Sequence, residues 1–263
     1  MMHATTGFIR TMRLAFNLAL YEVRAQRKET FLGLLWLIVW PVAQSAGFLL
    51  AFRVVRGEGL QLGGQAMLLA YFGVLIWTTA SSVLLGNLTI LKSNRDLVSQ
   101  VVFPCSVLSV VDVTAKFFYF LVQATVALAI WFVMTPDGQT AAALAYLLLY
   151  CIGFYLVLLA MAWVASILGV VLPDLSFVLP PVLTLLLVLS PIFQPDRGSL
   201  PWAVQLLNDV NPFSFCVAAW YAAIGVTGGI AQAPWLFVLS SVAAVGVSWA
   251  TVRVFYPQAM KVI

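Results

Sequence analysis

The sequence predicts an all-α integral membrane protein with six transmembrane helices, an N-terminal amphipathic interface helix and short re-entrant or gate helices between the fifth and sixth spans. Composition is the first observation: 63% of the 263 residues are hydrophobic and 8% are charged, whereas soluble domains are about 25% charged. The mean hydropathy is +1.05. A net charge of +4, without a clustered basic patch, argues against nucleic-acid binding.

Six apolar runs are the second observation, because a helix needs about 20 mostly apolar residues to cross a bilayer. The predicted spans are Phe31–Phe52, Met67–Leu91, Val107–Met134, Ala141–Leu172, Leu175–Phe193 and Trp235–Val252. The fourth run is over-long for an upright helix, which predicts a tilted or extended span. The fifth is shorter and contains Pro180, Pro181 and Pro191.

Residues 1–30 are predicted to form a cytoplasmic amphipathic helix on the membrane surface, and residues 31–263 the six-span transmembrane domain. In the first segment apolar residues recur at steps of three and four, with basic residues such as Arg10, Arg13 and Arg24 on the other side of the helix. These recurring basic residues also argue against a signal peptide. A plain cytoplasmic extension is the alternative.

The distribution of Lys and Arg predicts the orientation of the spans. With the N-terminus inside, nine of these residues fall in cytoplasmic segments and three in external ones. The nine are Arg10, Arg13, Arg24, Arg27, Lys28, Lys92, Arg95, Arg253 and Lys261, and the three are Arg53, Arg56 and Arg197. The positive-inside rule therefore predicts that both termini are cytoplasmic.

The region between the fifth and sixth spans, about residues 191–224, is semi-apolar and broken by prolines. It predicts two short helices, Pro201–Val210 and Phe213–Ile224, neither long enough to cross a bilayer. Irregular backbone at membrane depth is tolerated only against protein or a water-filled cavity. We therefore expect a helical hairpin that dips into the outer leaflet or lies on it, beside a pathway. An ordinary external loop packed on the helix ends is the alternative.

The chain lacks the sequence motifs of energy coupling and catalysis. There is no GxxxxGK[ST] segment, no GxSxG and no HExxH. The cysteines Cys105, Cys151 and Cys216 are far apart and His3 is the single histidine, which argues against a metal site. We therefore predict no catalytic residues, no metal and no cofactor bound by this chain. Energy for uphill transport would come from another subunit.

Asp112 and Lys116 are four residues apart near the start of the third predicted span. That spacing places them on one helix face, where they can form an ion pair. Charged residues inside a span suggest a functional site. We favour a structural role, with Lys116 reaching towards the lipid headgroups.

The first span carries an aromatic and amide stripe. Trp36, Trp40 and Gln44 follow one another at steps of one helical turn, with Gly47 beyond them. Trp36 is near the cytoplasmic interface, where tryptophan is common, whereas Trp40 is about 14 Å further in than Phe31. Such a stripe suits a ligand with flat apolar faces and hydroxyl rims, such as a sugar chain. Simple helix packing is the alternative.

Four fragments, taken in this order and spacing, resemble the permease subunits of ABC exporters for cell-surface polysaccharides (O-antigens, capsules and teichoic acids). They are "FLGLLWLIVWPVAQSAGFLLAF" from Phe31, "LVSQVVFPCSVLSVVDV" from Leu97, "LSPIFQP" from Leu189 and "LNDVNPFSF" from Leu207. The resemblance covers most of the chain.

The resemblance implies roles for three sets of residues. The first set lines a channel at the interface of a homodimer: Trp36, Trp40, Gln44 and Phe48. The second belongs to a cytoplasmic coupling helix of about residues 93–102 that inserts into the ATPase subunit: Ser93, Asn94, Arg95, Asp96, Leu97 and Gln100. Pro104 would end that helix. The third shapes an external gate hairpin of about residues 191–224: Pro191, Phe193, Asn211 and Pro212.

The function implied is the membrane half of an ATP-driven polysaccharide exporter in the bacterial cytoplasmic (inner) membrane. Its partners would be a second copy of the chain, two ABC ATPase subunits carrying ATP and Mg, a lipid-linked polysaccharide, membrane lipid and periplasmic export components. Three alternatives stay open: an ABC permease for a drug or lipid, a membrane-embedded enzyme of lipid-linked glycan metabolism, and a non-catalytic membrane scaffold.

Overall fold

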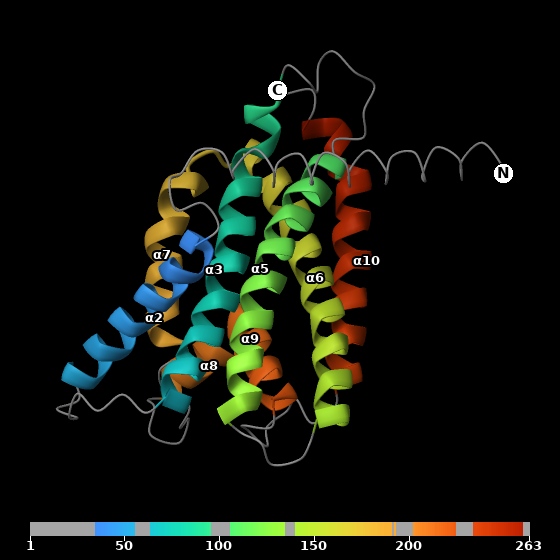
Figure 1. The fold of residues 1–263 in the computed structure, drawn as a ribbon. Helices are drawn as coiled ribbons and strands as arrows, with labels where there is room; N and C mark the ends of the chain where they lie inside the picture. The colour runs from blue at the N-terminus through green and yellow to red at the C-terminus, as the bar shows by residue number, and fades with distance from the viewer. Residues whose placement is uncertain are drawn as a thin grey trace.

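The computed structural model describes residues 35–55, 64–95, 106–134, 140–190, 192, 202–224 and 234–259. Regular structure in these residues is entirely helical (Figure 1). The helices are α2 (Trp36–Val55), α3 (Gly64–Ser93), α5 (Ser106–Met134), α6 (Thr140–Val171), α7 (Leu175–Leu189), α8 (Trp202–Val210), α9 (Pro212–Ala223) and α10 (Pro234–Ala259). The predicted interface helix of residues 1–30 lies outside the described residues.

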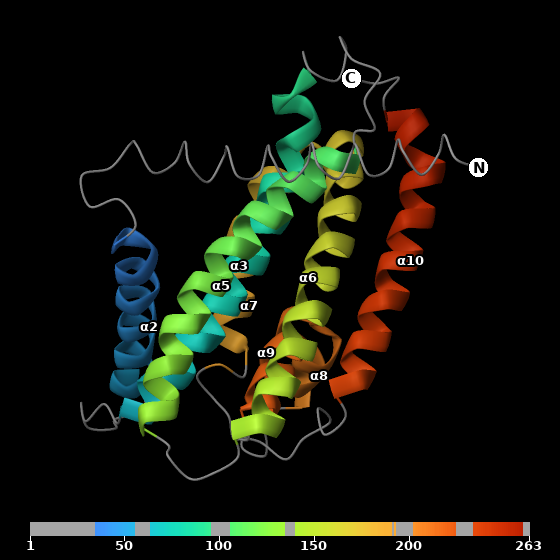
Figure 2. The same ribbon diagram turned by 45° about the vertical axis from the view of Figure 1, so that its right-hand side comes forward.

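The long helices α3, α5, α6 and α10 form one bundle, and α2 and α7 pack against α3 (Figures 1 and 2). Helices α3, α6 and α10 run in one direction and α5 runs in the opposite direction (Figure 1). The end of α3 and the start of α5 therefore lie at one end of the bundle, together with the end of α10. The short helices α8 and α9 lie at the opposite end (Figure 1).

Four of the described helices are long and apolar enough to cross a membrane, over Ala66–Ser93, Ser106–Met134, Ala145–Val171 and Trp235–Tyr256. The second, third, fourth and sixth predicted spans are thus present as long apolar helices. The apolar parts of the other two are shorter, Val39–Ala51 in α2 and Leu175–Leu189 in α7.

The fifth predicted span differs most from expectation. At 1.5 Å per residue, the 15 residues of α7 extend about 22 Å, which is less than the hydrocarbon thickness of about 30 Å. The predicted end at Phe193 lies outside the described residues. Pro180 and Pro181 stand inside α7 and remove two backbone donors from its hydrogen-bond ladder. Such helices are tolerated in membranes where neighbouring groups satisfy the backbone.

Helix α3 is the centre of the fold. Residues 70–77 are all buried, so this part of the helix is covered on every side, as in a helix at the heart of a bundle. It contacts α2, α5, α6, α7 and α9. At its crossing with α6 the backbones come very close, because a side chain at Gly169 would overlap the backbone of Leu88. Small residues allow such approaches between membrane helices.

Candidate functional site

The aromatic stripe of α2 divides into an exposed part and a packed part. Trp36 is 45% and Trp40 64% exposed. Gln44 is half-buried, and Phe48 packs against the main apolar core. The cause is helix geometry: each step of four residues turns about 40° past a full circle, so Trp36 and Phe48 are about 120° apart around the axis. The structure therefore brings Trp36 and Trp40 together on an outer face and separates Phe48 from them.

The two short helices predicted between the fifth and sixth spans are present, with ends within about one residue of expectation. Asn211 separates them and caps α9: the backbone N–H of Phe213 donates to Asn211 Oδ1 at 3.0 Å. Pro212 occupies the first turn of α9, where its missing N–H has no helical partner to lose. Pro191 and Phe193, the other two predicted gate residues, lie outside the described residues.

Helix α9 is inserted into the bundle. Trp220 is fully buried, and its ring centroid lies 4.9 Å from that of Tyr150, 5.1 Å from Phe72 and 6.0 Å from Phe120. These three rings belong to α6, α3 and α5. The Tyr221 hydroxyl donates to the Leu69 carbonyl at 2.8 Å. Helix α9 is therefore enclosed by the bundle helices along this stretch, a position that the sequence analysis did not predict.

Helix α8 differs from α9 in its exposure. Trp202 is 78% exposed, and Leu206 and Val210 are also exposed. The polar side of α8 faces its neighbour instead, since the Ser214 hydroxyl donates to the buried Asn208 Oδ1 at 3.1 Å. Helix α9 therefore lies inside the bundle, whereas α8 presents apolar side chains at the end of the bundle.

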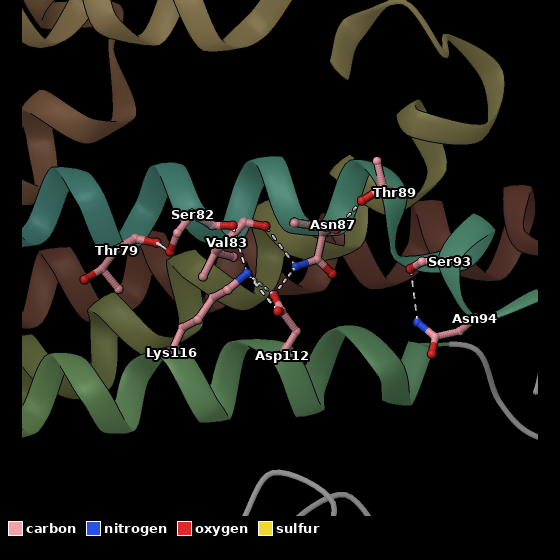
Figure 3. A network of polar contacts seen from close by, with 10 residues as sticks. Thr79, Ser82, Val83, Asn87, Thr89, Ser93, Asn94, Asp112 and Lys116 are labelled. Carbon is pink, nitrogen blue, oxygen red and sulfur yellow. Dashed lines mark hydrogen bonds and ion pairs between the residues drawn. The ribbon is translucent and has the colours of Figure 1, made fainter. Parts of the chain in front are cut away.

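The predicted coupling segment is described only at its beginning, where α3 ends. The Asn94 side chain donates to the Ile90 carbonyl at 2.9 Å and the Ser93 hydroxyl does so at 3.2 Å. Asn94 Nδ2 also donates to the Ser93 hydroxyl at 3.3 Å (Figure 3). The Ile90 carbonyl also accepts from the backbone N–H of Asn94 at 3.3 Å, so both side chains fold back onto the last helical turn. Arg95 is exposed. Asp96, Leu97 and Gln100 lie outside the described residues.

A polar cluster joins α3 to α5 below that end (Figure 3). Lys116 Nζ lies 2.7 Å from Asp112 Oδ1 and donates to the Ser82 carbonyl at 2.8 Å. Asn87 Nδ2 donates to Asp112 Oδ2 at 2.7 Å and to the Val83 carbonyl at 2.9 Å. The expected ion pair is confirmed. The expectation that Lys116 reaches the headgroups is wrong, because its ammonium crosses to α3.

The α3 half of this cluster was not predicted from the sequence. Asn87 is fully buried, and a polar amide inside an otherwise apolar span was a usable signal. Gly86 was not distinguishable from other glycines, yet a Cβ there would lie 2.5 Å from Lys116 Nζ. The lysine therefore passes over the backbone of Gly86.

Comparison with known families decides the class of protein. The profile of the family described as ABC-2 type transporter matches residues 15–225, a range that includes α2 to α9. The chain belongs to the ABC-2 type transporter family. It is thus a multi-pass membrane protein and the permease subunit of a transporter, without a catalytic domain. Permeases of this family pair with ABC ATPase subunits.

This ABC-2 permease is also similar to a characterised relative. It is 24% identical over 256 residues to the O-antigen export system permease protein RfbA of Myxococcus xanthus. The match covers 92% of this chain and 91% of the relative. The family resemblance expected from the sequence fragments is confirmed at the level of ABC-2 membrane subunits.

Proposed function

We propose that this chain is the membrane subunit of an ATP-driven exporter that moves a lipid-linked polysaccharide, such as O-antigen or capsular polysaccharide, out of the bacterial cytoplasm. The observation that carries the proposal is the near full-length similarity to an O-antigen export permease. The substrate class is consistent with the outer face of α2, where two tryptophans offer flat apolar surfaces to a sugar ring.

The arrangement of helices supports six spans with both termini cytoplasmic. Helices α2 and α7 run alongside the four long ones, and the end of α3 and the start of α5 lie at the end opposite α8 and α9 (Figures 1 and 2). The basic residues Lys92, Arg95 and Arg253 lie towards the same end of the bundle, as the positive-inside rule requires of the cytoplasmic side.

Two copies of the chain would form the channel. The outer faces of α2 and α7 are rich in exposed apolar side chains, among them Trp40 on α2 and Phe177 on α7, which is 81% exposed. Both helices pack on α3. Joining two copies along these faces would cover the apolar surface and place Trp36 and Trp40 along the seam, while α8 and α9 would stand at its outer end as the gate.

The loop that begins at Ser93 would be the coupling helix. Its position between the ends of α3 and α5 lets a cytoplasmic ATPase move both helices at once. Arg95→Glu or Leu97→Asp should therefore abolish export while ATP hydrolysis on the partner continues. Normal export by both variants would remove the coupling role.

One experiment tests the proposed function as a whole. The tagged chain is purified from its own host in a mild detergent. In a parallel culture, the host is depleted of the chain. We expect a soluble protein with Walker motifs to copurify at about one copy per copy of this chain, and lipid-linked polysaccharide to accumulate inside the depleted cells. An associated ATPase without any change in surface glycan would overturn the polysaccharide assignment in favour of a drug or lipid exporter.

A further inference from the structure

A polar cluster lies between α3 and α5, formed by Asp112, Lys116, Asn87 and the Ser82 carbonyl. Placing its charges inside a membrane span costs free energy, which better packing of the helices would not require. Lys116 lies about 15 Å along α5 from Ser106, inside a helix that is long and apolar enough to cross a membrane. Charges inside a membrane span are expensive, and a well-packed apolar pair commonly stabilises a fold as well as a buried ion pair does. We therefore look for a role of the cluster in the relative position of α3 and α5.

A polar network can define the register between two helices; here the half-buried ion pair lies within α5, and two of its hydrogen bonds cross to α3. The Asp112 carboxylate accepts from both Lys116 and Asn87, and Lys116 also donates to a backbone carbonyl of α3. Sliding or rotating α3 against α5 by one residue would break the two hydrogen bonds that cross between the helices, although the ion pair within α5 would remain. The two helices are consequently held in one relative position along this stretch.

These two helices are the ones that enter and leave the loop of residues 94–105. We propose that the cluster clamps α3 and α5 into a single lever, so that a displacement applied to this loop moves both helices together. Asp112, Lys116 and Asn87 are then positioning residues, which act on transport by holding the two helices together. The inference rests on the proposed coupling role of the loop.

At the end of α3 that lies away from the loop, the helix contacts α9. Helix α3 contacts α9 through Trp77 and Phe213, whose ring centroids are 4.7 Å apart, and through the bond from the Tyr221 hydroxyl to the Leu69 carbonyl. These contacts lie beyond the cluster on the side away from the loop. A clamped α3 therefore passes displacement from the cytoplasmic end to the helix inserted near the outer end.

Gly86→Ala is the sharpest test, because it leaves both charges in place. The new methyl group occupies the position that Lys116 Nζ approaches and should push the ammonium away from the Ser82 carbonyl. Alanine also strengthens a helix relative to glycine, so loss of function would not reflect a weakened α3. Gly246→Ala on α10 is the matched control, since a Cβ there meets nothing within 4 Å.

A second variant removes the clamp without leaving an unpaired charge. In Asp112→Leu combined with Lys116→Met, both charges go together, which preserves folding better than either single change. We expect Gly86→Ala and this double variant to lower export per ATP hydrolysed by about fivefold or more, the lower end of coupling between sites. Gly246→Ala should match the unaltered chain.

A distance measurement separates a lever from a merely structural role. Spin labels are placed at exposed positions on α3 and α5, as Thr89→Cys and Phe118→Cys, in a chain without its native cysteines and in complex with its ATPase. With the clamp intact, the distance between the labels should stay the same when ATP is added. With Gly86→Ala it should change or broaden. An ATP-dependent change with the clamp intact would overturn the proposal.

Arg95→Glu, measured in parallel, distinguishes the two levels of inference. If Arg95→Glu uncouples export and both clamp variants behave normally, the loop couples and the clamp does not. If Arg95→Glu and the clamp variants all export normally, the coupling role of the loop fails as well. Uncoupling by all three, with Gly246→Ala unaffected, is the expected result.

Discussion

Helices α2 and α9 both carry aromatic residues and both pack on α3, but their tryptophans lie in opposite environments. On α2, Trp36 and Trp40 are exposed, whereas on α9, Trp220 and Phe213 are buried among rings of the bundle. The length of α9 explains why it lies inside the bundle. The 12 residues of α9 extend about 18 Å and cannot reach both membrane surfaces, so their polar ends need protein around them. Trp36 and Trp40 are thus available to a partner, whereas Trp220 and Phe213 are part of the core.

The largest expected effect concerns the buried side of this comparison. Trp220→Ala should lower stability by about 3–5 kcal/mol, because it empties a site enclosed by three helices. The measurement is thermal unfolding of the purified permease in detergent. Trp202→Ala on α8 is the matched control, since the same residue is removed from an exposed position and should cost little. Equal losses for the two variants would mean that α9 is not packed as described.

A smaller effect is expected at the junction between α8 and α9. Asn211→Ala removes the acceptor for the Phe213 N–H and should lower stability by about 1 kcal/mol, the usual cost of losing a helix cap. Asn211→Ser retains a capping oxygen and should restore most of the difference. An unchanged melting temperature for Asn211→Ala would show that the insertion of α9 does not depend on its cap.

The smallest effect on stability, and the clearest effect on transport, is expected on the exposed side. Trp40→Ala should change stability by less than about 0.5 kcal/mol, as for other exposed positions, yet slow export more than Trp36→Ala does, because Trp40 lies deeper along α2. Export rate and melting temperature are measured on the same preparations. If both variants export normally, the two tryptophans serve packing or lipid contact alone.

The sequence predicted the helices well because apolar length and proline positions are local properties. The four long helices follow from uninterrupted apolar runs, and the boundary between α8 and α9 follows from Asn211 and Pro212. Burial is not local. Nothing in the residues of α9 distinguishes a helix on the surface from one inside the bundle, since this depends on the rings that α3, α5 and α6 contribute.

The candidate site was predictable to the same degree. The spacing of Asp112 and Lys116 predicted their ion pair, but its direction towards α3 depends on Asn87 and on the absence of a side chain at Gly86, about 25 to 30 residues earlier in the chain. Likewise the α2 stripe was predicted as a single row, although a period of 3.6 residues carries Phe48 away from Trp36.

The insertion of α9 also sets an order for assembly of the membrane domain. Chains fold from the N-terminus as they are synthesised, so α3, α5 and α6 enter the membrane before α9 exists. Until Trp220 emerges, the rings of Phe72, Phe120 and Tyr150 lack the side chain that lies among them. A nascent chain that stops short of residue 212 would have most of its long helices and an unfilled centre, which is a feature that membrane quality control could recognise.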